Sequence, residues 1–306
     1  MKIRDEVRLL RHGRDWRGRS TVPRSADPWV QSEEERDFPT AWARTRPAVV
    51  VRGALRRGLL RPVTWSQTRP VVEGVEYLEN LHGPAVFVAN HSSHLDAPLI
   101  VSSLPRRFAD RLAVGAAADY FFDARVRAAA TVLFFNAFPV ERHGSRRLRS
   151  LAVELLDDGW NLLLFPEGTR SEDGWMNAFK PGTAQLCVSK GVPVVPVALR
   201  GAYAAMPRGR NWPVPGRPRI AVRYGRPLHP VEGEGFRELR TRMMQAVTRL
   251  AAEEELGWYG ALRAEADNEL ELPTRPSEGG GAAGWRRIWD STRPSDDGPG
   301  RRVWTW

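Results

Sequence analysis

The chain has 306 residues, which is enough for one large hydrophobic core or two small ones. A hydrophobic content of 42% is typical of a globular protein, and a mean hydropathy of -0.43 argues against a protein with many membrane-spanning helices. A net charge of +10 favours contact with a polyanion, either nucleic acid or an anionic lipid surface.

The N-terminal segment, residues 1–46, is rich in charge and is interrupted by proline and glycine, so we expect a loosely ordered extension. No apolar run follows its charged residues, and we therefore expect no signal peptide. No stretch of eighteen apolar residues without a charge occurs, so we expect no membrane-spanning helix. We therefore expect the chain to lie in the cytoplasm.

Residues 47–62 predict a short basic helix. Apolar residues recur there at helical spacing, namely Val51, Ala54, Leu55 and Leu59. Arginines occupy the rest of the helix surface, namely Arg52, Arg56, Arg57 and Arg61. One interpretation is an amphipathic helix lying in a membrane interface, with its arginines reaching lipid phosphates. The other is a helix that packs its apolar stripe on the protein core.

The pattern from about residue 70 alternates between apolar runs and helical stretches. The runs predict strands at 85–89, 112–117, 137–140, 161–165, 193–199 and 219–224. Helices are expected between them, at 97–104, 121–134, 145–157, 180–190 and 235–256. Such alternation predicts an α/β layered fold with a mostly parallel sheet flanked by helices. Together with the basic helix, this region forms one predicted domain, residues 47–259.

Residues 260–306 are rich in polar residues, glycine and proline, which predicts a disordered tail. Tryptophans alternate there with arginines, namely Trp285, Trp289, Trp304 and Trp306. This composition suits a membrane interface or stacking on single-stranded nucleic acid, and a tail without a partner is a third interpretation. The single cysteine, Cys187, excludes an internal disulfide, and its apolar surroundings indicate a small buried thiol.

The segment Asn90 to Asp96, N-H-S-S-H-L-D, follows the first predicted strand of the domain. His91 suits a general base, and Asp96 suits a carboxylate that orients the imidazole. The two side chains can meet only if residues 91–95 form a turn that leads into a helix. His94 is interpreted as a solvent-facing or packing residue, and no further cysteine or histidine lies at ligand spacing, so we expect no metal.

The segment Phe165 to Ser171, F-P-E-G-T-R-S, follows the predicted strand 161–165. A guanidinium binds phosphate oxygens in a bidentate manner and keeps its charge, which makes Arg170 and Arg142 candidates for an anion site. Turn residues can add donors, namely Gly168 and Thr169. A carboxylate repels phosphate, so we assign Glu167 to orienting Arg170 or a hydroxyl of the substrate.

These segments resemble the glycerolipid acyltransferase family, the 1-acylglycerol-3-phosphate acyltransferases and their relatives. That family carries N-H-x4-D, a short block ending in arginine, F-P-E-G-T-R-S, and a V-P-V-x-P-V strand. The blocks of this chain are Asn90 to Asp96, Phe138 to Arg142, Phe165 to Ser171, and Val192 to Val197. The resemblance covers roughly residues 70–230. One departure concerns the second block, where Asn136-Ala137 replaces the family's glycine.

The resemblance implies an O-acyltransferase that moves a fatty acyl group from acyl-CoA or acyl carrier protein to a lysophospholipid without a covalent acyl-enzyme. The acceptor that the resemblance implies is 1-acylglycerol 3-phosphate, with phosphatidate as product. Glycerol 3-phosphate, a lyso-aminolipid or a glycolipid are alternative acceptors. Family members use the arginines of the second and third blocks for the phosphate, and Lys180 matches a common family lysine. No cofactor is implied, and lipid substrates favour a peripheral enzyme on the cytoplasmic face of the cell membrane.

Two other functions would account for part of the sequence. A nucleic-acid-binding protein would account for the charge and for the Trp/Arg tail, but it leaves the His91/Asp96 pair and the Phe165–Ser171 segment without a role. We therefore expect no nucleic-acid partner. A catalytically inactive relative that serves as a membrane scaffold is disfavoured by the intact motifs.

Overall fold

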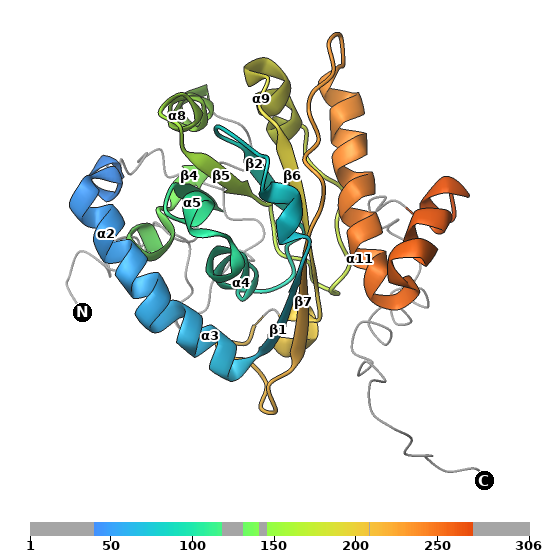
Figure 1. The fold of residues 1–306 in the computed structure, drawn as a ribbon, viewed down its shortest axis with the longest axis horizontal. Coiled ribbons are helices and arrows are strands. Elements are labelled where there is room, and N and C mark those ends of the chain that lie inside the picture. Colours follow the sequence, from blue (N-terminus) through green and yellow to red (C-terminus); the bar gives the residue numbers. More distant parts are fainter. Residues whose placement is uncertain (1–39, 118–130, 141–145, 208, 272–306) are drawn as a thin grey trace, which may run out of the picture. The chain divides into compact units, whose positions relative to one another are not determined.

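The computed structural model describes residues 40–117, 131–140, 146–207 and 209–271 (Figure 1). Most of the predicted N-terminal extension, Arg142 in the second block, and the tryptophans of the tail lie outside the described residues.

A seven-stranded sheet forms the centre of the described chain, in the order β1-β7-β6-β2-β5-β3-β4. The strands are β1 (Arg69–Glu73), β2 (Val86–Ala89), β3 (Leu112–Ala117), β4 (Phe138–Val140), β5 (Asn161–Leu164), β6 (Val194–Arg200) and β7 (Arg219–Tyr224). Neighbours are parallel except β6 and β7, which confirms the predicted α/β fold with a mostly parallel sheet. Six strands were predicted, and the seventh, β1, is an edge strand whose residues are only partly buried, so it lacks the apolar run of a central strand.

Helices cover both faces of the sheet (Figure 1). Phe87 and Ala89 of β2 point to a core shared with α4 (Asp96–Ser103) and α5 (Arg106–Ala109). Val86 and Val88 point to the opposite core. That core also holds α8 (Arg146–Asp157), α9 (Gly182–Lys190) and α11 (Phe236–Ala266). Short helical turns complete the described chain, namely η2 (Ala41–Arg44), η4 (Val75–Leu78) and α10 (Ala202–Ala205).

The predicted basic helix exists, but its arginines are not all on the outside. It comprises α2 (Arg46–Leu55), a π-helical turn η3 (Arg56–Leu60) and α3 (Arg61–Gln67). Arg52 and Arg56 are only 1% and 5% exposed, whereas Val51 and Leu59 of the predicted apolar stripe are 48% and 49% exposed. The interpretation in which that stripe packs on the protein core is therefore wrong.

Two buried guanidinium groups attach this helix to the domain. Arg52 Nε donates to the carbonyl of Leu133 at 2.9 Å, and Arg56 Nε donates to that of Phe134 at 2.7 Å. Arg56 Nη1 also donates to the carbonyl of Ala109, the last residue of α5. Residues 131–135 are helical, so the arginines meet the carbonyl ends of helices, where a positive charge is favoured. Burial lowers the pKa of Arg56 to about 9, which leaves it charged at neutral pH.

The backbone explains the asparagine that replaces the family's glycine. Asn136 follows the helical residues 131–135 and has a φ of 50°, in the left-handed region that favours glycine. Asparagine is one of the few other residues that tolerate this region. Its N–H donates to the carbonyl of Val132 at 2.8 Å and ends the helix. Asn136 can therefore form the left-handed turn at this position without a glycine.

The helix α11 continues to Ala266, past the predicted start of the disordered tail at residue 260. Gly257, with a φ of 70°, interrupts it, and the chain then turns back on itself (Figure 1). The ion pair between Arg249 and Glu265, at 3.0 Å, joins the two limbs. The sequence predicted a helix over residues 235–256 but not the second helical limb after Gly257, because a glycine ordinarily marks a helix end. Residues 260–266 therefore belong to the folded domain.

We predict that Arg56→Met lowers the free energy of unfolding by roughly 1–3 kcal/mol, because it leaves buried carbonyl groups at Phe134 and Ala109 without their donor. Arg57→Met is the matched control, because the Arg57 side chain is 51% exposed and lies 4.0 Å from Asp110. Urea unfolding of both variants measures the difference. Equal losses would show that the buried guanidinium contributes no more than an exposed one.

Candidate active site

Two motif loops leave the sheet at the same edge. The strands β2 and β5 are parallel neighbours, with Val88 opposite Leu164, so the segments 90–96 and 165–171 begin side by side. We call this side of the sheet, where β2, β5 and β6 end, the loop edge. Carboxyl ends of parallel strands are where α/β proteins commonly place their binding sites.

His91 and Asp96 meet as predicted. His91 Nδ1 lies 2.9 Å from Asp96 Oδ2, and the same oxygen accepts the backbone N–H groups of Ser92 and Ser93 at 2.7 and 2.8 Å. Asp96 is the first residue of α4 and is completely buried. The turn that the spacing required is therefore held by the carboxylate itself.

The His91 imidazole is held on a second side by an aromatic ring. It stacks on Phe165, with ring centroids 4.1 Å apart and planes inclined by 24°. Its side chain is 22% exposed, so one part of the ring reaches solvent. Because Asp96 occupies Nδ1, Nε2 is the nitrogen that can take a proton from a substrate hydroxyl.

Glu167 connects the two motif loops. Its Oε1 accepts the N–H of His91 at 2.6 Å, and its Oε2 accepts the backbone and side-chain N–H groups of Asn177 at 2.8 and 3.0 Å. The N–H of Ser171 donates in turn to the carbonyl of His91 at 2.8 Å. This buried carboxylate therefore positions the backbone of the site. Its predicted role, which is to orient Arg170 or a hydroxyl of the substrate, stays a prediction.

Burial shifts the pKa of two groups at this site. It raises the pKa of Glu167 to about 8, although the donated N–H groups act in the opposite direction. It lowers the pKa of His94 to about 4, and the nearby Arg170 charge lowers it further. His94 is thus a half-buried, neutral ring close to Arg170 and His91, which is compatible with the predicted packing role.

The predicted anion-binding residues lie on the loop that follows β5. Gly168 has a φ of 75°, and a Cβ there would lie 2.8 Å from Lys180 Nζ, so the lysine side chain passes directly over this glycine. The Lys180 N–H donates to the carbonyl of Pro166 at 2.8 Å, which fixes the crossing. Thr169 is exposed and Arg170 is half-buried on the same loop. The loop edge thus carries both the His91–Asp96 pair and basic side chains.

Three supporting residues were not among the predicted site residues. Asn90 pairs with β6, donating to the carbonyl of Leu199 at 3.0 Å and accepting its N–H at 2.8 Å. Ser93 Oγ donates to the carbonyl of Met206 at 2.8 Å, and Asn177 binds Glu167. The place of Asn90 beside His91 was a signal in the sequence, whereas no motif marks Asn177, which lies ten residues after its partner Glu167.

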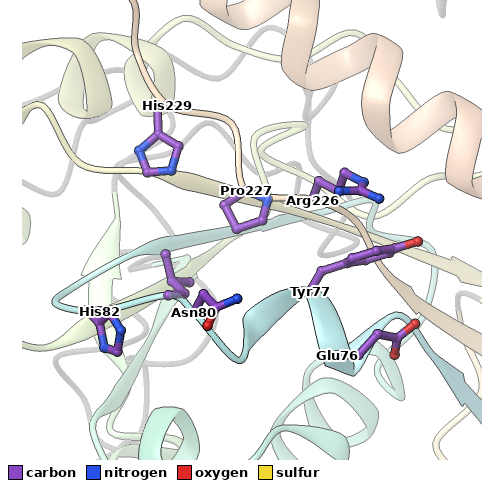
Figure 2. Close-up of a pocket in the computed structure, with 8 residues that line it drawn as sticks. Glu76, Tyr77, Asn80, His82, Arg226, Pro227 and His229 are labelled. Carbon is purple, nitrogen blue, oxygen red and sulfur yellow. The ribbon is translucent and has the colours of Figure 1, made fainter.

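A cavity of about 580 Å³ lies at the opposite edge, where β7 ends and β6 begins (Figure 2). Figure 2 shows Arg226 beside the Tyr77 ring, with its guanidinium carbon 4.8 Å from the ring centroid. The lining residues are Glu76, Tyr77, Asn80, Leu81, His82, Arg226, Pro227 and His229. None of the predicted site residues is among them, so the candidate active site rests on the chemistry of the loop edge and not on cavity size.

Known proteins share the region that holds this site. A family model described as Acyltransferase matches residues 69–200. A chloroplast 1-acyl-sn-glycerol-3-phosphate acyltransferase of Arabidopsis thaliana is 32% identical over 161 residues, which cover 52% of this chain and 43% of that relative. A 1-acyl-sn-glycerol-3-phosphate acyltransferase of Pseudomonas aeruginosa is 36% identical over 115 residues, or 35% of this chain and 42% of the relative. The chain thus spans less than half of the length of these two relatives.

A solved structure agrees with the fold. The crystal structure of the 1-acyl-sn-glycerophosphate acyltransferase of Thermotoga maritima superposes with a TM-score of 0.55 at 28% identity, over 71% of this chain and 86% of that one. The matched segment 69–200 contains His91, Asp96, Glu167 and Arg170, whose geometry is described above. Residues 69–200 thus match the acyltransferase family, and the similar proteins that share this region are 1-acyl-sn-glycerol-3-phosphate acyltransferases.

Proposed function

We propose that this protein transfers a fatty acyl group from an acyl thioester, either acyl-CoA or acyl carrier protein, to the free hydroxyl of 1-acylglycerol 3-phosphate, giving phosphatidate. The observation that carries the proposal is the 2.9 Å contact between His91 and Asp96, on the same edge of the sheet as Arg170 and Lys180. The names of the similar proteins support the same acceptor.

The geometry suits direct transfer. The acceptor hydroxyl gives its proton to His91 Nε2 as its oxygen attacks the thioester carbonyl, and Asp96 stabilises the resulting imidazolium. When the carbon–sulfur bond breaks, the imidazolium can return the proton to the departing thiolate. Arg170 and Lys180 supply the positive charge for the phosphate of the acceptor, and Arg142 is a further candidate from the sequence.

We also propose that the protein acts as a peripheral protein at the cytoplasmic face of the cell membrane. None of the described helices is long and apolar enough to cross a bilayer. The outer face of η2, α2, η3 and α3 instead exposes large apolar side chains, namely Trp42, Val50, Val51, Leu59 and Val63. Exposed arginines accompany them, namely Arg46, Arg57 and Arg61. An apolar face with a basic rim suits an anionic leaflet.

The proposed function predicts thiol release from a long-chain acyl-CoA in the presence of 1-acylglycerol 3-phosphate, and the loss of this activity in His91→Ala. Loss of a general base typically lowers the rate by ~10²–10⁴. Asp96→Asn removes the carboxylate that orients the imidazole, so its turnover falls severely as well. The assay uses a panel of acceptors that includes glycerol 3-phosphate, a lyso-aminolipid and a glycolipid. If His91→Ala keeps more than roughly a tenth of wild-type turnover, the base is assigned wrongly.

Arg170→Ala is expected to act through the phosphate of the acceptor. A charge-assisted hydrogen bond is worth roughly 1.5–3 kcal/mol, so the KM for 1-acylglycerol 3-phosphate rises by about ten-fold or more while the KM for acyl-CoA changes little. The control is the same variant with monoacylglycerol, which lacks the phosphate and is expected to show no such loss. Equal effects on both acceptors would remove Arg170 from the phosphate site.

Glu167→Gln is expected to change how stability depends on pH. Burial raises the pKa of Glu167 from its ordinary 4.5 to about 8, so the folded chain binds this proton more tightly than the unfolded chain. The free energy of unfolding therefore falls as pH rises through this interval, by an amount on the order of 3 kcal/mol between about pH 5 and pH 8. Urea unfolding across this range is expected to show that Glu167→Gln removes the decline, whereas Glu172→Gln, at an exposed site, retains it. A decline that persists in Glu167→Gln would contradict the assignment.

The apolar face of α2, η3 and α3 is expected to bind membranes. Replacing Val50, Leu59 and Val63 with serine removes exposed apolar area without disturbing Arg52 or Arg56, and so weakens sedimentation with anionic liposomes by about ten-fold or more. Val231→Ser is the control, because Val231 is also exposed but lies between β7 and α11, away from this face. Unchanged liposome binding by the triple variant would exclude the face.

A further inference from the structure

Two adjoining cavities form a groove on the edge of the sheet opposite His91. The cavity of about 580 Å³ described above adjoins a second one of about 290 Å³, and the two share Glu76, Tyr77 and Arg226 (Figure 2). We call this feature the β1–β7 groove, because residues at the ends of both strands line its smaller part. None of the predicted site residues lines either part, so the proposed reaction gives the groove no role.

The reversal of α11 supplies an apolar wall to this groove. Trp258 and Leu262 line the smaller part, and they are nevertheless 62% and 39% exposed. Leu256 and Tyr259 beside them are 52% and 71% exposed. Large apolar side chains gathered on a surface in this way mark a place where a partner binds. The occupant that fits the groove therefore brings large apolar side chains of its own.

Two of the arginines that line the groove are already bonded to carboxylates. Arg223, which is only 7% exposed, donates through Nε to Glu73 at 2.7 Å and forms an ion pair with Glu254 at 2.6 Å. Arg249 forms an ion pair with Glu265 at 3.0 Å. The positive charges of both arginines are thus balanced within the domain.

Two further carboxylates and one further arginine line the groove. Glu253 lies 3.9 Å from the already bonded Nε of Arg223, and Glu76 is exposed. The arginine is Arg226, which stands over the Tyr77 ring. When the partners of the bonded arginines are included, carboxylates outnumber arginines around the groove, although the net charge of the chain is +10. A positively charged occupant is therefore favoured, and an anionic lipid headgroup is not.

The tail that follows α11 carries side chains of both kinds. Residues 285–289, Trp-Arg-Arg-Ile-Trp, combine two indole rings and an isoleucine with two guanidinium groups. Indole rings suit the apolar wall that Trp258 and Leu262 form. Guanidinium groups suit carboxylates and also stack on aromatic rings. The composition of this segment thus complements the groove in both respects.

The segment is also within reach of the groove. Glu271, the last described residue, follows Leu262 by nine residues, and the chain is helical as far as Ala266. At about 1.5 Å per helical residue and at most about 3.5 Å per extended residue, Glu271 lies within about 25 Å of Leu262. The fourteen residues from Glu271 to Trp285 can span up to about 50 Å. Because the segment is tethered to the domain, its binding is intramolecular and needs little intrinsic affinity.

We propose that residues 285–289 dock in the β1–β7 groove of the same chain, with their tryptophans against Trp258 and Leu262 and their arginines facing Glu76 and Glu253. The inference is independent of the proposed acyl transfer, because the groove lies on the edge opposite His91. It gives the tail a partner within the chain in place of lipid or nucleic acid. A tail docked there leaves the loop edge open to substrates.

Trypsin cleavage of the full chain after Arg286 and Arg287, followed by mass spectrometry, tests the docking, because a docked segment is cleaved only when it leaves the groove. We expect the double variant Trp258→Ser, Leu262→Ser to be cleaved there at least about ten-fold faster than wild type. Its midpoint of urea unfolding is expected to be unchanged, because both side chains are exposed. Val231→Ser, at an exposed position outside the groove, is the matched control and keeps the wild-type rate. An unchanged rate in the double variant overturns the proposal.

Engineered cysteine pairs report on the same contact by a second route. Leu262→Cys combined with Trp289→Cys is expected to form a disulfide within one chain several times faster than Arg263→Cys combined with Trp289→Cys. The control position has the same tether to the tail and is exposed, but Arg263 lines neither part of the groove. The native Cys187 does not compete, because it is buried. Equal rates for the two pairs overturn the proposal.

The same measurements identify other occupants. A disulfide that joins two chains, at a rate that rises with protein concentration, would place a second copy in the groove. Protection from trypsin that appears only with vesicles of phosphatidylcholine and phosphatidylglycerol, or only with oligothymidylate, would assign the tail to lipid or to nucleic acid. Each of these results overturns the proposal.

Activity separates this inference from the proposed function. The double variant Trp258→Ser, Leu262→Ser is expected to release thiol with 1-acylglycerol 3-phosphate at the wild-type rate, because the groove lies on the edge opposite His91. A protein that releases no thiol with any acceptor would refute the proposed function. The cleavage and disulfide measurements would still decide whether the tail docks.

Discussion

The site depends on the buried carboxylate of Glu167. Its two oxygens accept N–H groups from His91 and Asn177, which belong to different loops. A carboxylate in this position is costly to bury, because water no longer solvates it, and the same burial raises its pKa to about 8. The three N–H groups that it accepts offset part of this cost, so their geometry constrains where the His91 backbone can lie. The imidazole, the Asp96 carboxylate and the basic loop with Arg170 are consequently placed relative to one another by one hydrogen-bonding centre.

The basic helix shows a related use of charge. Arg52 and Arg56 turn inward to the carbonyl ends of other helical segments, and the apolar residues Val51 and Leu59 turn outward. An amphipathic surface helix of a soluble protein does the reverse. The inversion is stable because backbone carbonyls at helix ends have no partner within their own helix, and a guanidinium can satisfy several of them at once. It leaves an apolar face outside, which is the property that a membrane-bound acyltransferase would use.

Lipid substrates make the surroundings of the loop edge part of the proposed chemistry. The edge carries His91, and the end of α3 lies beside the turn that holds Trp212. Glu255 of α11 forms an ion pair with Arg200 at the end of β6, and Glu254 forms one with Arg219 at the start of β7. Ion pairs of partly exposed residues add little stability individually, but here they set the position of the reversal at Gly257.

The sequence by itself predicted the pairing of His91 with Asp96 and most of the fold. The six apolar runs became β2 to β7, because strands buried on both faces must be continuously apolar, and the spacing of His91 and Asp96 already required a turn into a helix. The tertiary structure alone decided the rest. It added the edge strand β1, which is too exposed to show such a run, and it reversed α11 at Gly257, where local signals mark only an end. It also assigned Glu167 to the backbone of His91 and turned Arg56 inward, because both partners are distant along the chain. Local residue patterns report burial and backbone preference, whereas the partner of a buried charge is set by which distant segments the fold brings together.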